Sequence, residues 1–161
     1  MPKRATPRAN LVIRPARDLN WKRVLRGAEM AVLGGDPKGA GSLYAIRIRL
    51  RDAFVTPPHW HPQDEHVTVL EGTFLLGSGR RFDPRKLLVL RPGTHVVVPK
   101  RKPHFSRSRG RTLLEVYGSG PFNTIYVNPE EDPNKKARTL NRGERIATRE
   151  RNRVSSRANR M

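Results

Sequence analysis

The sequence contains no cysteine among its 161 residues. Disulfide bonds, thiolate metal sites and cysteine nucleophiles are therefore excluded. It also lacks any run near the roughly 18 consecutive apolar residues that span a membrane. The apolar run at residues 11–13 is shorter than the hydrophobic region of a signal peptide, which needs about 7–15 residues. We therefore expect a cytoplasmic protein with no membrane partner.

Acidic residues are scarce, because 14 Asp and Glu face 33 Lys and Arg, for a formal net charge of +19. Most of the excess positive charge lies at the two ends of the chain. Residues 1–17 carry five basic and no acidic residues, and residues 133–161 carry ten basic and two acidic residues. We interpret residues 1–17 as a flexible basic arm and residues 133–161 as a disordered basic tail. Such ends favour weak, nonspecific nucleic-acid binding that is sensitive to salt, or are simply solvated.

The stretch between the ends, residues 18–132, indicates one all-β domain. Fourteen prolines and thirteen glycines interrupt the chain often, which favours short strands over helices. Residues 42–51 show the clearest alternation, with apolar residues at even positions from Tyr44 to Leu50 and arginines at 47, 49 and 51. We interpret the arginine row as the solvated side of an edge strand, where cations discourage pairing with other chains.

Further strands are expected wherever apolar runs lie between turn signals. Breaks are predicted at Pro57-Pro58, at Glu71-Gly72 and at the loop of residues 77–79. The strands expected around them cover residues 31–37, 67–69, 73–76, 87–90, 94–98, 112–117 and 125–127. Many short strands with almost no helix predict a β-sandwich or barrel.

Four residues in this domain have the chemistry of a metal site. His59 and His61 point the same way if they lie on a strand, and Glu65 keeps the same parity. His104 follows later, directly after Pro103. Neutral imidazoles and a carboxylate suit a divalent ion such as Fe, Mn, Ni or Zn. Three imidazoles and one carboxylate also leave positions open on the ion, as chemistry at a metal requires.

Two other histidines are not expected to bind the metal. His66 is adjacent to Glu65 and therefore faces the opposite side of a strand. His95 lies on the expected strand at residues 94–98 and is interpreted as a core or surface residue. An alternative for the four candidate ligands is a network of polar barrel residues that bond to one another without a metal.

The spacing of these residues resembles that of a known family. The segment His59-x-His61-x3-Glu65-x6-Gly72 resembles the first conserved motif of the cupin superfamily, and Gly93-x5-Pro99-x4-His104 resembles the second. Similarity to small single-domain bacterial cupins covers roughly residues 28–133. The second motif departs from the family at Arg101, where glycine is usual, and at Ser108, where asparagine is frequent.

The resemblance implies a cupin-type double-stranded β-helix, or jelly-roll barrel, across residues 18–132. It also implies one divalent metal ion at the centre of the barrel, with His59, His61, Glu65 and His104 as its ligands. Since cupin barrels commonly pair through their sheet edges, we expect a homodimer by analogy.

Three functions stay open. The first is a metal-dependent enzyme of dioxygenase, isomerase or lyase type that acts on a small organic molecule. The second is a non-catalytic cupin that binds or senses a small molecule, since a fold alone does not fix function. The third is a nucleic-acid-associated scaffold that binds through its basic tails. No second catalytic constellation is apparent, so catalytic residues other than the metal ligands stay unassigned.

Overall fold

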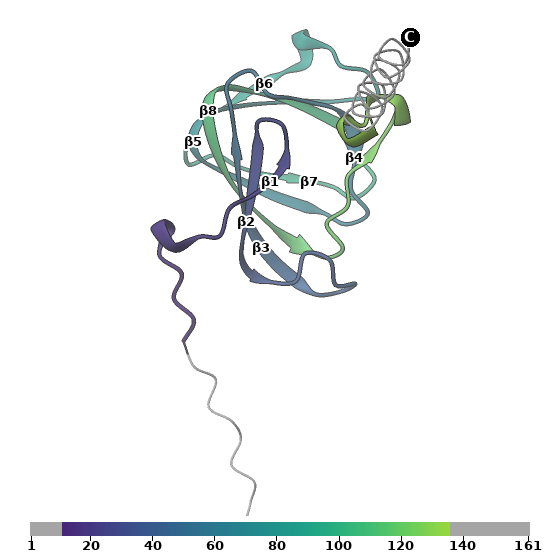
Figure 1. Cartoon of the computed structure of the whole chain (residues 1–161). Helices are drawn as coiled ribbons and strands as arrows, with labels where there is room; N and C mark the ends of the chain where they lie inside the picture. The colour runs from purple at the N-terminus through teal and green to yellow at the C-terminus, as the bar shows by residue number, and fades with distance from the viewer. Residues whose placement is uncertain (1–10, 136–161) are drawn as a thin grey trace, which may run out of the picture.

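The computed structural model describes residues 11–135, and within them nearly all regular structure is strand, as predicted (Figure 1). Most of the expected tail and part of the expected arm lie outside the described residues. The strands are β1 (Lys22–Leu25), β2 (Ala28–Gly35), β3 (Leu43–Leu50), β4 (Val55–Trp60), β5 (Glu65–Ser78), β6 (Leu88–Leu90), β7 (His95–Val98), β8 (His104–Ser119) and β9 (Ile125–Tyr126). Three short 3₁₀ turns accompany them, η1 (Ala16–Asp18), η2 (Pro84–Lys86) and η3 (Pro129–Glu131). No helix in residues 11–135 has the length and apolar character that crossing a membrane requires.

The strands form one antiparallel sheet that curls into an open barrel (Figure 1). Its main order is β1-β2-β3-β8-β4-β9, and β5 pairs with β6, β7 and β8. The long strand β8 joins these parts. Its first half pairs with β4, its second half pairs with β3, and β5 runs beside nearly all of it. The start of β8, which carries His104, is therefore fixed by pairing on two sides.

The prediction that the arginine row belongs to an edge strand is wrong. Strand β3 lies between β2 and β8 and is paired with both along its length. The alternation itself is confirmed, because Ile46 and Leu50 are buried while Arg47 and Arg49 face outward and are only half-buried. Cations on an internal strand have no edge to protect.

Two expected breaks are absent. Strand β5 continues through Glu71-Gly72, where two register shifts against β8 form a bulge, and Gly72 adopts a φ of +76° that favours glycine. Strand β4 includes Pro57-Pro58, and its pairing with β8 skips from Thr56 to His59 at that point. Prolines lack an amide donor, so the irregular pairing accommodates them within the strand.

The core lies on the inner face of the curled sheet. Ile46, Val69 and Val116 are fully buried and come from β3, β5 and β8. Each such side chain contributes about 1.5–3 kcal/mol through burial. Tyr44 and Val67 are buried with them. The packed strands thus form a stable frame around the histidines.

Candidate metal centre

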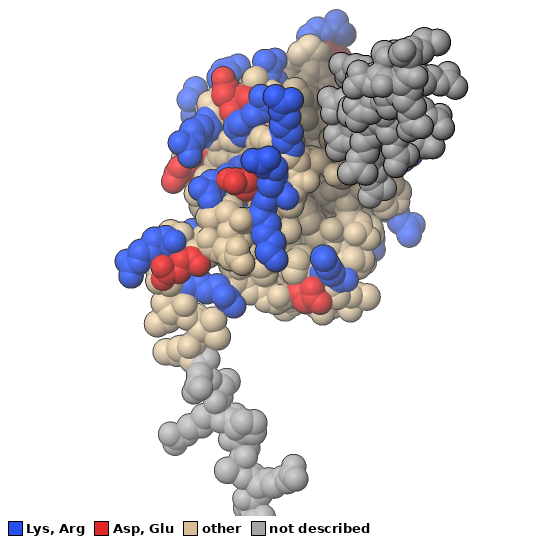
Figure 2. All heavy atoms as spheres, viewed as in Figure 1, with Lys and Arg blue, Asp and Glu red and all other residues tan. Residues whose placement is uncertain are grey.

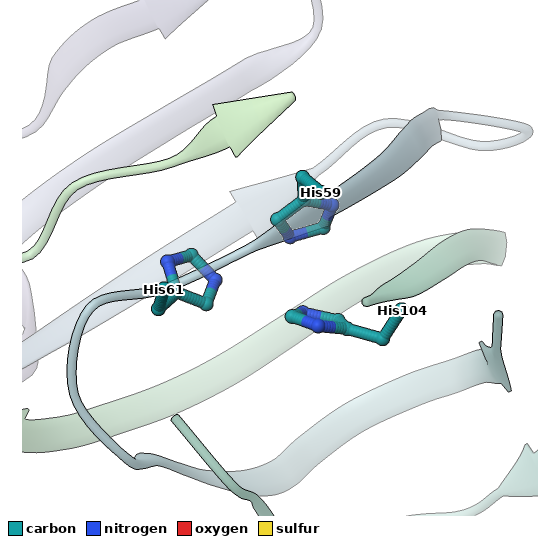
Figure 3. A group of neighbouring side chains, drawn as sticks. All are labelled: His59, His61 and His104. Atoms are coloured by element: carbon teal, nitrogen blue, oxygen red, sulfur yellow. The ribbon is translucent and has the colours of Figure 1, made fainter. Parts of the chain in front are cut away.

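Three of the predicted ligands meet inside the barrel. His59 lies near the end of β4, His61 directly after β4, and His104 at the start of β8. Their rings point toward one another from these separate segments (Figure 3). All three are about 95% buried, and one nitrogen of each lies within 4.8 Å of the others. Such a group can hold a metal ion.

Glu65, the first residue of β5, lies against two of these rings. Its Oε2 is 3.5 Å from Nε2 of His61 and 3.6 Å from Nε2 of His104. An ion about 2.1 Å from each ligand separates neighbouring ligand atoms by about 3.0–3.4 Å in octahedral or tetrahedral geometry. The observed separations are close to these values. Whether Glu65 is a ligand stays a prediction.

Backbone carbonyls set the orientation of all three rings. In each ring, Nδ1 lies within hydrogen-bond distance of a carbonyl oxygen, and a carbonyl can only accept, so Nδ1 carries the proton. In a neutral imidazole, Nε2 then has a free lone pair, the usual state of a metal-binding histidine. The three pairs are His59 with Pro57 at 2.7 Å, His61 with Asn123 at 2.8 Å, and His104 with Lys102 at 3.0 Å.

The electrostatics of the centre favour a cation. Burial, together with the neighbouring His104 and His61, lowers the pKa of His59 to about 3. Burial also lowers the pKa of His61. For Glu65 burial raises the pKa, but the ring nitrogens of His104 and His61 outweigh it and hold the pKa below its ordinary value.

With Nδ1 as the protonated nitrogen, the Nε2 atoms of the three rings and the carboxylate of Glu65 turn their electron pairs toward the same point. Nε2 of His61 is buried and has no hydrogen-bond partner within the described part of the chain. A buried acceptor without a partner is costly, and several facing one another are more so. A bound divalent cation removes this cost, so the residues present fit a metal ion.

The three histidines line part of a cavity of about 380 Å³ in the barrel. The rest of its wall is mainly apolar and includes Ile48, Phe54 and Leu76. Although the chain is strongly basic, no Lys or Arg belongs to the lining among residues 11–135. This volume is at the lower end of the range for small-molecule sites.

The segment after β8 supplies a wall of the cavity that sequence reasoning missed. Phe122 stacks on the ring of His61, with centroids 5.1 Å apart and planes 17° apart. Tyr126 lies 6.0 Å from the ring of His59, and burial together with Asp132 raises its pKa to about 12. The sequence predicts a strand at residues 125–127 but does not indicate that Phe122 or Tyr126 borders the site.

The other two histidines lie elsewhere, as predicted. His66 stacks on Tyr117 with centroids 4.6 Å apart, and His95 lies beside both rings. His95 is exposed and its Nδ1 lies 2.8 Å from Oγ1 of Thr68. Neither belongs to the three-histidine group.

The two departures from the cupin motif have structural roles here. Arg101 adopts a φ of +60°, the conformation that glycine favours, and its amide donates to the carbonyl of His61 at 2.8 Å. Ser108 is fully buried; its Oγ donates to the carbonyl of Arg51 at 2.6 Å and accepts from the amide of Phe54 at 2.9 Å. Arg101 therefore preserves the turn before His104, although it is not the glycine that is usual at this position.

The antiparallel barrel and the three buried histidines in its cavity wall make this chain a β-barrel protein with a candidate metal centre. The chain belongs to the cupin family, because the family model described as Cupin matches residues 38–144. No curated protein matches the sequence.

Solved structures share the fold. The polyketide cyclase RemF from Streptomyces resistomycificus superposes with a TM-score of 0.64 at 21% identity, covering 77% of this chain and 90% of that one. KdgF from Halomonas sp. gives 0.54 at 18% identity, with 68% and 94% covered. Salicylate 1,2-dioxygenase from Pseudoaminobacter salicylatoxidans with gentisate gives 0.51 at 18% identity, with 62% and 26% covered. At these identities the likeness establishes the fold alone.

Proposed function

We propose that this cupin is a metal-dependent enzyme that acts on a small, largely apolar organic molecule. The observation that carries the proposal is the convergence of three buried imidazoles, each with Nδ1 bonded to a backbone carbonyl, in the wall of a mainly apolar cavity. A purely structural site would have no need of a cavity beside it.

In this proposal Nε2 of His59, His61 and His104 and the carboxylate of Glu65 hold one divalent ion of Fe, Mn, Ni or Zn. When bound, such an ion polarises a substrate oxygen or supplies redox chemistry. The chain's own contribution is to fix the rings through carbonyl partners and, by burial, to keep the imidazoles of His59 and His61 neutral.

The cavity wall determines which molecules enter. Its apolar side chains exclude water and favour a molecule with an apolar body. Because no Lys or Arg in the described residues lines the cavity, a carboxylate or phosphate on the substrate has no cationic partner in the wall. We therefore expect a neutral or phenolic substrate with one oxygen facing the metal.

The shared fold supports the reaction class without fixing it. Among the solved structures with this fold, one is named a polyketide cyclase and another a salicylate 1,2-dioxygenase. Our candidates stay reactions of dioxygenase, isomerase or lyase type. A fold hosts many chemistries, so the metal must be identified first.

The test is the metal content of the purified protein, measured by elemental mass spectrometry beside two variants. We expect about one equivalent of a divalent metal in the wild type, loss of most of it in His61→Ala, and no loss in His95→Ala, the matched control. Absence of metal after incubation of the wild type with each ion would refute the proposal. Turnover of neutral phenols and enols, under air and under argon, then separates oxygen-dependent from oxygen-independent chemistry.

A second candidate is a binding or sensing cupin without turnover. It is favoured by the scarcity of acid–base groups: among the described residues lining the cavity, Tyr126 and Asp132 are the only ionisable side chains besides the four predicted ligands. Saturable binding of a phenol to the metal-loaded protein, without product under either gas, would favour this candidate over the enzyme.

A further inference from the structure

A second depression, separate from the metal centre, lies on the outer face of the barrel. It has a volume of about 840 Å³ and runs between the segment after η1, strand β1 and the outward face of β3, with β8 at one end. Lys and Arg side chains gather on the face that carries β1 and β2, with acidic side chains among them (Figure 2). Six arginines line this arginine groove: Arg23, Arg26, Arg47, Arg49, Arg51 and Arg111.

Two of these arginines are part of the wall. Arg47 is ion-paired with Glu115 at 3.1 Å, and Arg49 with Glu29 at 3.7 Å. The guanidinium of Arg49 also stacks on the ring of Trp21, 3.6 Å from its centroid. These contacts hold Arg47 and Arg49 in place at the floor of the groove, and the two glutamates neutralise the positive charge there.

The other four arginines are exposed, and the acidic residues in the described lining of the groove are Glu29, which pairs with Arg49, and Glu71. Within residues 11–135, Arg23, Arg26, Arg51 and Arg111 form no ion pair with an acidic side chain. Like charges held along one groove repel one another, and an anionic ligand relieves that repulsion.

We propose that the arginine groove binds the sugar-phosphate backbone of a single-stranded nucleic acid. A guanidinium presents a planar fork that matches the oxygens of a phosphate, and Lys lacks this geometry. The four arginines without an ion pair come from β1, the turn after it, the residue after β3 and β8, so they are spread along the groove and are not gathered at one point. A small isolated anion would need one or two such groups, whereas four exposed arginines along a groove suit a chain of linked anions.

The proposal places the contact on the folded domain and not on the basic ends. Its test therefore compares two variants of the full chain with equal net charge. The groove variant combines Arg23→Gln, Arg26→Gln and Arg111→Gln. The control combines Arg80→Gln, Arg81→Gln and Arg91→Gln, which are exposed residues outside the groove.

Binding is measured by fluorescence anisotropy with a labelled, mixed-sequence single-stranded DNA of about 12 nucleotides. For the groove variant we expect affinity to fall on the order of tenfold, and the slope of log affinity against log salt to become shallower by about 2. The control should change both quantities less. Unchanged melting temperature and metal content in the groove variant show that the barrel is intact.

Three results would overturn the proposal. The first is equal loss in both variants, which assigns the binding to overall charge or the basic ends. The second is absence of binding by the wild type at low salt. The third is binding to polyglutamate or to phosphatidylserine vesicles that equals binding to DNA and falls in the groove variant, which makes the partner an acidic protein or a membrane surface.

Discussion

The ring of His61 donates a hydrogen bond from Nδ1 to the backbone carbonyl of Asn123, 62 positions later in the sequence, over a distance of 2.8 Å. Phe122, the residue before that carbonyl, stacks on the same ring. The segment after β8 therefore sets both the tautomer and the plane of one predicted ligand. Partners of this kind tune metal affinity without touching the ion.

Replacing Phe122 with alanine tests that dependence. Loss of the stacked ring frees the His61 imidazole to rotate and lets water reach it. We expect metal affinity to fall by roughly 10–100-fold, measured by competition with a chelator. Phe82→Ala removes a ring that packs on Phe105 instead and is the matched control. Equal losses in the two variants would show a general effect on stability.

Ser108 is expected to matter for folding and not for metal binding. Ser108→Ala leaves the amide of Phe54 and the carbonyl of Arg51 without their side-chain partner in a buried place. We expect the free energy of unfolding to fall by about 2 kcal/mol in a denaturant titration. Ser78→Ala, at an exposed position, should change it by less than about 0.5 kcal/mol. Metal content at saturation should stay that of the wild type in both.

The left-handed conformation of Arg101 predicts an order of stability for substitutions there. Valine is β-branched and tolerates a positive φ poorly, so Arg101→Val should lower the free energy of unfolding by about 1–2 kcal/mol. Glycine relieves strain but gains freedom in the unfolded chain, so Arg101→Gly should remain within about 0.5 kcal/mol of the wild type. If valine proves as stable as arginine, the turn can adopt another conformation.

The pKa of His59 predicts how acid affects the metal-free protein. Its folded-state pKa of about 3 lies below the ordinary 6.5, so between these values the unfolded chain binds a proton that the folded chain does not. His59 should therefore lower the free energy of unfolding by about 1.4 kcal/mol for each pH unit below 6.5. His59→Asn removes this contribution, and a shallower pH dependence of its melting temperature, with chelator present, is the measurement. Identical slopes would contradict the prediction.

Local signals in the sequence predicted much of the fold. Alternation from Tyr44 to Leu50 gave β3, and the spacing of His59, His61 and His104 gave the buried cluster. The sequence did not reveal that β5 crosses Glu71-Gly72, because a bulge against β8 is a property of the pairing and not of the residues themselves. The alternation also says nothing about neighbouring strands, so it cannot distinguish an internal strand such as β3 from an edge strand.

The candidate site is likewise only partly predictable from the sequence. Ligand identity depends on side chains, which a sequence states directly. The partners that orient the ligands are main-chain carbonyls, at Pro57, Asn123 and Lys102, and every residue has one. No residue type marks a position whose carbonyl faces an imidazole. That information exists only once β4, β8 and the segment after it are in place.

The cavity is lined by Leu25 of β1 and by Asn134, which lie near opposite ends of the described chain. The wall around the three histidines is therefore complete only when residues from both ends of the described chain are in place. Removing either of these segments would open the cavity to water, although all three histidines would still be present in the sequence.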